Sequence, residues 1–286
     1  MNLRLLETPA ELTAVEELQR LVWPGDDTEI VPVHMFLAAI HGGGLVIGAY
    51  EGEQLVGFVF GFPGFDATSS GPRPRHCSHM AAVHPDYRDG GLGFKLKRAQ
   101  WQIVRQQGLD HITWTYDPLQ SRNARLNIAK LGAVCNTYLP EYYGEMRDGL
   151  NRGLPSDRFQ VDWWVNSSRV RRCLSKTPRR ALDLAHYLSA DIPRVNETSL
   201  NDTGLVVPLT PDSRTLPPAP LLLLEIPADF LALKAIDPAL ALEWRSHTRS
   251  LFTHLFECGY LVTDFVHLPG SQPRSYYVLS DGLATL

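Results

Sequence analysis

Hydrophobic and polar residues follow one another in this chain with the two periods of helices and strands. From Pro9 to Val22 the apolar residues recur every three or four positions, the period of a helix with one buried face, and Thr8 is placed to cap its start. The same period predicts further helices over 32–40, 92–107, 121–130 and 237–257. Short runs rich in β-branched and aromatic residues predict strands over 2–6, 45–50, 55–62, 76–83, 111–116, 134–138, 159–165, 221–226, 261–267 and 275–279. The order of these elements predicts an α/β fold built on a mixed sheet.

Three stretches interrupt this pattern. Residues 62–74, rich in glycine, proline and serine, predict a loop. Residues 171–180 are basic, and 196–220 are rich in Pro, Thr and Asp with few candidates for a core. We therefore expect a main domain over 1–168, a connector over 169–220 and a β-α-β-β extension over 221–286. Because so short a segment makes only a small core, we expect residues beyond about Arg180 to dock on the main domain or on a second copy of the chain.

The most informative stretch of the chain runs from Met80 to Arg98. An apolar strand ends at Pro85, three glycines crowd the turn that follows, and Leu92 opens an amphipathic helix. Glycine in such a turn permits positive φ and close approach to the backbone. The start of the helix presents unpaired N–H groups and the positive end of its dipole. The stretch therefore predicts a binding site for a phosphate or a pyrophosphate.

The spacing of the glycines separates this turn from two common nucleotide-binding loops. It lacks the Gly-Lys-Ser/Thr ending of a P-loop, and Leu96 stands where a Rossmann fingerprint needs its third glycine. What remains is Arg-x-x-Gly-x-Gly from Arg88 to Gly93, preceded by Val-His-Pro-x-Tyr. Between a strand and an amphipathic helix, this pattern resembles the acyl-CoA pyrophosphate loop of the GNAT superfamily of N-acyltransferases. The order of elements through about Val165 is similar to the GNAT arrangement as well.

The resemblance implies a GNAT-like acyltransferase fold and direct transfer of an acyl group from CoA to an amine in a ternary complex. It also implies that a bulge of the central strand at Val83 presents a backbone N–H to the thioester carbonyl. The CoA-binding residues that it implies in and before the turn are Ala82, Val83, His84, Arg88, Asp89, Gly90, Gly91, Leu92 and Gly93. In the second CoA-facing helix, Ser121 and Ile128 stand at the usual Asn and Tyr positions. Asn123 and Asn127, one turn apart on one face, are expected to supply displaced polar contacts.

The sequence alone does not identify the residue that acts as the catalytic base. Many relatives carry a Glu where this chain has Met80, so the candidates are His79, His76, Asp117 or a chain of water molecules. Tyr143, with Tyr138 and Tyr142 near it, is the candidate for protonating the leaving thiolate. By analogy with the family, Trp23 and residues 24–33 cover the acceptor.

Composition and charge limit the classes of ligand and partner that we expect for this protein. The net charge of −4 argues against a general nucleic-acid binder, so an anionic ligand must be met by local basic residues, namely Arg88, Lys95, Lys97 and Arg98. Cys77, Cys135, Cys173 and Cys258 are scattered, which is typical of reduced thiols in a cytoplasmic protein. The N-terminus lacks the apolar run of a signal peptide, and 221–224 is too short to span a bilayer, so we expect no membrane partner. His76 and His79 alternate along a strand and point to opposite faces, so we expect no metal.

The sequence thus predicts an acyl-CoA-dependent N-acyltransferase (EC 2.3.1.-) that acts on the amine of a small molecule, with amino acids among the acceptors. The donor is acetyl-CoA or another acyl-CoA, succinyl-CoA included, because some longer relatives use larger acyl groups. Two alternatives stay open: a protein or peptide amine as the acceptor, and a non-catalytic acyl-CoA-binding regulatory module. Residues 257–260 echo 130–133, so we expect the extension to be a degenerate GNAT-like half. We expect it to form part of the acceptor wall without touching CoA, and a homodimer is compatible with the sequence.

Overall fold

A computed structural model describes residues 1–25, 27–68, 71–146, 149, 151–175, 182–209 and 219–282. The chain divides into two compact units, which are described separately. The first contains Met1–Trp114, Arg147–Arg152 and Asp162–Asn166, and the second contains Thr115–Met146, Gly153–Val161 and Ser167–Leu286. This division does not follow the expected domain boundaries at 168 and 220, and those boundaries stay a prediction. Parts of the expected connector, 176–181 and 210–218, lie outside the described residues.

The first unit is a sheet with helices on both faces. Its elements are β1 (Asn2–Leu5), α1 (Pro9–Val22), a 3₁₀ turn η1 (Asp27–Glu29), α2 (Val33–His41), β2 (Leu45–Glu51), β3 (Gln54–Thr68), β4 (Gly71–Val83), a second 3₁₀ turn η2 (Pro85–Tyr87), α3 (Leu92–Gln106) and most of β5 (His111–Tyr116). The strands lie in the order β1-β2-β3-β4-β5, antiparallel except for β4 and β5, which are parallel. The mixed α/β sheet that the sequence predicts is confirmed.

Local sequence explains the start of α1. The Thr8 hydroxyl accepts from the backbone N–H of Glu11, and the Glu11 carboxylate accepts from the backbone N–H of Thr8, which makes a capping box. Pro9 occupies the first helical position, where a missing N–H costs nothing. The helix and its cap, both predicted from the sequence, are confirmed.

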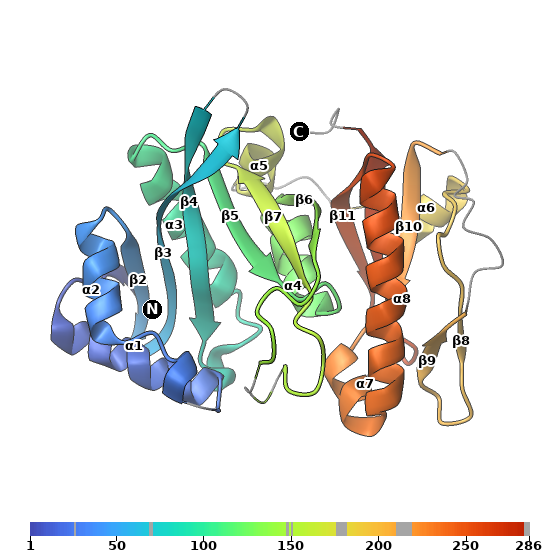
Figure 1. The fold of residues 1–286 in the computed structure, drawn as a ribbon, viewed down its shortest axis with the longest axis horizontal. Helices are drawn as coiled ribbons and strands as arrows, with labels where there is room; N and C mark the ends of the chain where they lie inside the picture. Colours follow the sequence, from blue (N-terminus) through green and yellow to red (C-terminus); the bar gives the residue numbers. More distant parts are fainter. Residues whose placement is uncertain are drawn as a thin grey trace. The chain divides into compact units, whose positions relative to one another are not determined.

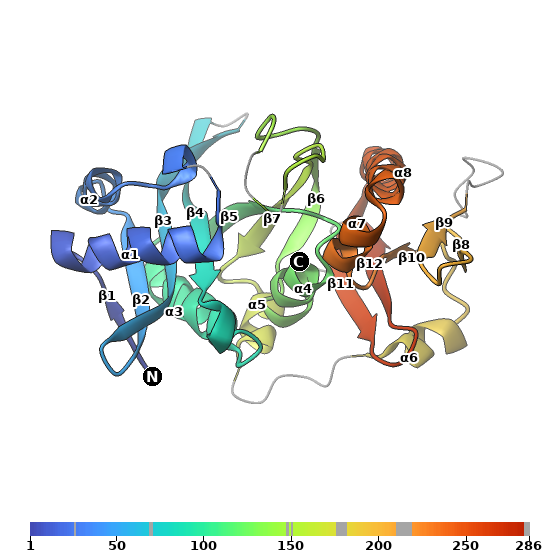
Figure 2. The same ribbon diagram turned by 90° about the horizontal axis from the view of Figure 1, so that it is seen from below.

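Alternating residues of β3 decide which helices cover which face. Phe58 and Phe60 are buried with residues of α1 and α2 in the main apolar cluster of this unit. Gly57 points the other way, and a Cβ there would stand 3.2 Å from Leu92 and from Leu96 of α3. Figure 2 shows the same arrangement, with α1 and α2 on one side of these strands and α3 on the other.

The loop expected over 62–74 is wrong, because β3 continues to Thr68 and β4 already begins at Gly71. The two strands pair through this segment, with Phe65 opposite Pro74. Pro72 and Pro74 alternate, so their missing N–H groups fall on one edge of β4 and leave the other edge able to pair. Composition alone indicates a loop here, and the cross-strand pairing overrides that tendency.

The second unit combines paired strands with a long helix. Its elements are α4 (Ser121–Ala124), which continues as a π-helical turn η3 (Arg125–Lys130), β6 (Val134–Leu139), the start of β7 (Arg158–Trp164), α5 (Ser168–Cys173), α6 (Leu184–Ser189), β8 (Thr198–Leu200), β9 (Val206–Pro208), β10 (Leu221–Ile226), α7 (Phe230–Ile236), α8 (Pro238–Glu257), β11 (Tyr260–Leu268) and β12 (Arg274–Asp281). Four of its strands lie in the order β6-β11-β12-β10, and β11 and β10 both pair with β12 antiparallel. The sequence pattern does not predict α5 to α7, β8 or β9.

Helix α8 runs beside β11 (Figure 1) and also contacts β6, an earlier strand of the same unit. Asp237 caps it by accepting from the N–H of Leu240. Phe252 of α8 packs on Phe159 of β7 with ring centroids 4.7 Å apart, and on Tyr277 of β12 at 5.3 Å. Beside an apolar cluster of its own, the extension therefore shares aromatic packing with Phe159 of β7 in the same unit.

Candidate functional site

The turn after β4 is held by short-range backbone bonds. The N–H of His84 still donates to Val56 of β3, and the N–H of Tyr87 then donates to the carbonyl of His84 at 2.9 Å. The His84 Nδ1 atom accepts from the N–H of Asp86 at 3.3 Å. These bonds turn the chain out of the sheet and bring the glycines to the start of α3.

One of the three glycines of this turn, Gly91, adopts the left-handed conformation that glycine permits. Asp89 and Gly91 have φ of 65° and 74°, and Gly91 is the N-cap of α3. A Cβ on Gly91 would meet nothing within 4 Å, so the site is open, and it is the backbone conformation that favours glycine there. Helix geometry leaves the N–H groups at the start of α3 without partners in the helix. Left-handed residues followed by a helix start form a concave nest of N–H groups, which suits a phosphate.

The basic residues near this turn divide into two kinds. Arg88 and Lys95 are exposed, and the Arg88 Nε atom donates to the carbonyl of Val83 at 3.3 Å. Lys97, expected to help meet an anion, is instead buried beneath the sheet. Its Nζ atom donates to Ser78 at 2.8 Å and lies 3.6 Å from the ring centroid of Trp114. Burial holds the pKa of Lys97 well below its usual 10.5, so Lys97 cannot serve as a surface cation.

Strand β4 is irregular in its middle instead of at its end. Its pairing with β3 is in register at Val83 and shifts between Phe60 and Phe62. On its other edge, the parallel pairs with β5 end at Cys77. The predicted position of the bulge, at Val83, is therefore wrong. The bulge lies at residues 78–79, where an extra residue redirects the strand.

A cavity of about 520 Å³ lies beside this bulge, within the first unit. Its wall is mostly apolar and comes from η1, α2, β3 and β4. The apolar residues that line it include Ile30, Val31, Pro32, Met35, Phe60 and Phe62. Its polar residues are Glu29 and His79.

His79 contributes the titratable nitrogen of this cavity. Its ring contacts Phe60 edge-on at 5.9 Å between centroids and lies 6.0 Å from the ring of Phe62. The side chain keeps contact with solvent, yet these apolar neighbours lower the pKa of His79 below its usual 6.5 by desolvation. The imidazole is therefore neutral at physiological pH and able to accept a proton.

His76 lies on the opposite face of β4. It is fully buried, and its Nε2 atom lies 3.1 Å from Nε2 of Gln100 in α3. Burial, reinforced by the nearby Lys97, lowers the pKa of His76 to about 3. His76 is remote from the cavity face, so its place favours a structural role.

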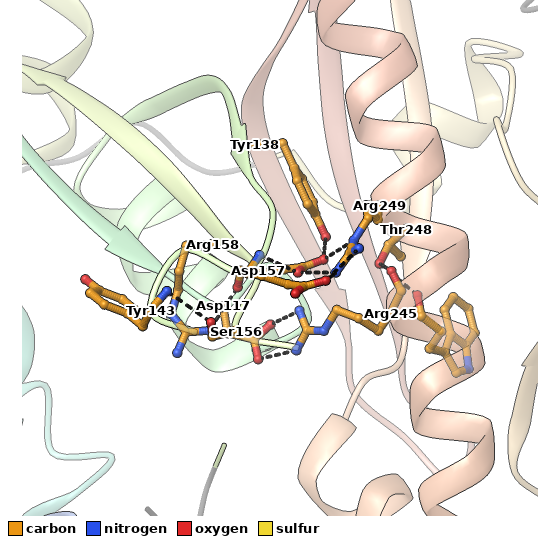
Figure 3. A network of polar contacts seen from close by, with 11 residues as sticks. Asp117, Tyr138, Tyr143, Ser156, Asp157, Arg158, Arg245, Thr248 and Arg249 are labelled. Atoms are coloured by element: carbon orange, nitrogen blue, oxygen red, sulfur yellow. Dashed lines mark hydrogen bonds and ion pairs between the residues drawn. The ribbon is translucent and has the colours of Figure 1, made fainter. Parts of the chain in front are cut away.

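Asp117, a base candidate from the sequence, is held in an ion pair in the second unit (Figure 3). Its carboxylate accepts from both terminal nitrogens of Arg245, at 2.8 and 2.6 Å, and from the N–H of Leu119 at 2.9 Å. The side chain of Arg245 is only 2% exposed. Both oxygens of the Asp117 carboxylate are thus occupied by donors within this unit, so its place favours a structural role.

The three tyrosines considered for thiolate protonation lie in the second unit and differ in environment. Tyr138 donates to Asp157 at 2.6 Å, and burial raises the pKa of Tyr138 far above its usual 10. Tyr142 and Tyr143 are exposed. The Tyr143 hydroxyl lies 2.8 Å from that of Thr115, and its backbone N–H donates to Ser156. Tyr143 is thus the tyrosine that combines a solvent-accessible ring with a hydrogen-bonded hydroxyl.

Asn123 and Asn127 do not share one face as expected. Asn123 is exposed, whereas Asn127 is 6% exposed. The physical reason is the π-helical turn, in which the N–H of Leu131 bonds the carbonyl of Leu126. Its wider turn changes the angle between residues four positions apart from that of an α-helix.

Sequence reasoning missed the charged residues that surround Asp117. Arg249 of α8 binds Asp157 through Nε at 2.8 Å and through a terminal nitrogen at 2.6 Å, and Asp157 also accepts from Tyr138 (Figure 3). Two arginines spaced four apart on α8, Arg245 and Arg249, are the signal that could have revealed buried carboxylate partners.

Neither a metal centre nor a membrane span is seen in the part of the chain that the structure describes. Within those ranges, His, Cys, Asp and Glu side chains form no group of three or more that could hold a metal ion. No helix among the described residues combines the length and the apolar character needed to cross a bilayer.

Comparison with known proteins gives a family match for part of the chain. Residues 12–132 match the Acetyltransferase (GNAT) family. Among solved structures, the chain is similar to aminoglycoside 6'-acetyltransferase type Ii at 17% identity, covering 58% of this chain and 99% of that chain with a TM-score of 0.44. It is similar to the ribosomal-protein-S18-alanine N-acetyltransferase from Escherichia coli at 15% identity, covering 58% and 95% with a TM-score of 0.41. It is also similar to yncA from Salmonella typhimurium, solved with its cofactor acetyl-CoA, at 17% identity, covering 64% and 98% with a TM-score of 0.43. A search of curated proteins returned no match.

Proposed function

We propose that this chain, whose residues 12–132 belong to the GNAT acetyltransferase family, transfers an acyl group from an acyl-CoA to the amine of a small molecule. The GNAT family uses acetyl-CoA as its cosubstrate. The donor proposed here is acetyl-CoA or a larger acyl-CoA such as succinyl-CoA, and amino acids are among the proposed acceptors. The observation that carries the proposal is the open nest of N–H groups at Gly91, at the start of α3.

The nest fits a pyrophosphate in three respects. Gly91 leaves it open, the first turn of α3 aims its N–H groups and its dipole at the site, and Arg88 and Lys95 are exposed beside it. We assign pyrophosphate binding to residues 88–93. The N–H groups that β4 frees at its bulge, residues 78–79, are our candidates for polarising the thioester carbonyl.

We assign the general base to His79. In the reaction, the acceptor ammonium gives its proton to the neutral imidazole, and the amine nitrogen then bonds to the acyl carbon and loses a second proton as the amide forms, which balances the proton that sulfur takes up. The C–S bond breaks with its electron pair on sulfur, and CoA leaves as a thiol once that sulfur is protonated. Tyr143 stays a prediction for the last proton, and Asn123 and Asn127 stay predictions for CoA contacts.

The test replaces Gly91 by Asp. A carboxylate about 4 Å from the pyrophosphate repels each of its charges by about 4 kcal/mol at an effective dielectric constant of ~20. We therefore expect CoA affinity, measured by calorimetry, to fall at least ~10³-fold and acylation to be lost. Gly52→Asp is the matched control, because Gly52 also has positive φ (59°) and a Cβ there would likewise meet nothing within 4 Å.

Parental CoA affinity in Gly91→Asp would refute the assignment of the pyrophosphate site. Equal losses in Gly91→Asp and Gly52→Asp would attribute the effect to backbone strain. Tight CoA binding by the parent without turnover on any amine would instead favour a regulatory acyl-CoA-binding module.

A further inference from the structure

The cavity beside His79 has a chemistry that restricts what can enter it. Its wall is apolar apart from Glu29 and His79. Among the described residues that line it, none carries a positive charge at neutral pH, because the lowered pKa of His79 keeps that ring neutral. A pocket of this size and polarity is typical of a site for an apolar group of a small molecule.

We propose that the acceptor is a primary amine attached to an apolar group, and that this cavity binds the apolar group while the amine lies at His79. The inference rests on the proposed function and deepens it by naming the acceptor class. His79 lies upstream of Val83 by roughly 13 Å of extended strand, so the cavity is well separated along β4 from the nest that takes the pyrophosphate.

Three features of the cavity favour this occupant over a polar amine. An apolar group gains by leaving water for the side chains of Met35, Phe60 and Phe62. Several hydroxyls would lose their water without enough polar partners, and a second ammonium would find one carboxylate, Glu29, on a wall that is apolar apart from that residue and His79. A carboxylate inside the cavity would meet no cation among the described residues that line it, so the carboxylate of an amino acid must lie outside it.

The test measures kcat/KM with acetyl-CoA and succinyl-CoA for two apolar and two polar primary amines, of which 3-methylbutylamine and 1,4-diaminobutane are matched in size. We expect 3-methylbutylamine and 2-phenylethylamine to exceed 1,4-diaminobutane and ethanolamine by at least ~10-fold, the scale of discrimination by an apolar pocket. Met35→Lys places a cation in the cavity and should raise KM for the apolar amines at least ~10-fold. Met35 is already 51% exposed, so the variant can fold without burying the ammonium of the new lysine.

Leu21→Lys is the matched control, because Leu21 is 50% exposed on α1 and does not line the cavity. We expect it to keep the parental KM, and Met35→Leu to restore most of the loss. CoA affinity should be the same in all three variants, which separates an acceptor defect from a folding defect.

Equal or better turnover of the polar amines, or an unchanged KM in Met35→Lys, would overturn the inference and leave the proposed function standing. If no amine is acylated, the proposed function fails, and the cavity is then tested by calorimetric titration of 2-phenylethylamine in the presence of CoA. Binding that Met35→Lys abolishes would still support the apolar site, and no binding by the parent would overturn it.

Discussion

The ion pair between Asp117 and Arg245 gives a sharp test of how the second unit is held together. Both terminal nitrogens of Arg245 bind the carboxylate, at 2.8 and 2.6 Å, and the side chains of Arg245 and Asp117 are 2% and 10% exposed. Arg245→Met leaves a buried carboxylate that still accepts from the N–H of Leu119, and Asp117→Leu leaves a buried guanidinium. Breaking a buried pair by removing one partner costs about 3–5 kcal/mol, because an uncompensated charge stays out of water.

The assay is urea unfolding followed by circular dichroism, with the slope m compared across variants. We expect each single variant to lose about 3–5 kcal/mol of unfolding free energy, and the double variant Asp117→Leu/Arg245→Met to lose less than either single variant. Arg20→Met, which breaks the exposed pair of Arg20 and Asp27, is the control and should cost about 1 kcal/mol or less.

Kinetics on the conservative variant Asp117→Asn separate this structural role from a catalytic one. A general base contributes on the order of 10²–10⁴-fold in rate. A loss of that size in kcat, together with parental stability in both single variants, would refute the reasoning and make Asp117 a candidate base again.

Two histidines of β4 give two further predictions. His79→Ala should lower kcat on the order of 10²–10⁴-fold with CoA affinity unchanged. In the parent, kcat/KM should fall on acidification through a pKa below 6.5, because the base works deprotonated. Parental turnover and the same pH profile in the variant would exclude His79 as the base. His76 should make the protein acid-sensitive. The pKa of His76 is about 3 in the folded protein and about 6.5 in the unfolded chain. The free energy of unfolding therefore keeps its full contribution from His76 above pH 6.5, and it falls by up to about 1.4 kcal/mol per pH unit as the pH drops from 6.5 toward 3. His76→Gln removes that part of the slope in urea unfolding measured between pH 7 and 4, and an unchanged slope would contradict the burial argument.

Several features of this protein follow from the sequence because they depend on near neighbours in the chain. The capping box of Thr8 and Glu11, the left-handed Gly91 and the helix that begins at Leu92 are set by residues within one turn of each other. The family of residues 12–132 could be recognised for the same reason, because the Arg88–Gly93 pattern encodes its own backbone geometry. Strand β5 and strand β10 lie within the predicted bounds.

Only the tertiary structure decided which partner each polar or irregular residue would meet. In the sequence Asp117 is a candidate base, whereas in the structure Arg245, 128 residues later, binds its carboxylate. The sequence predicts that Lys97 is a surface cation, whereas in the structure its amino group is buried against Trp114 and Ser78. The hairpin over 62–74 and the π-helical turn after α4 also depend on pairing and packing that short-range periodicity does not encode. The sequence sets the conformation of each short segment, whereas burial and charge partners arise from contacts between segments far apart in the chain.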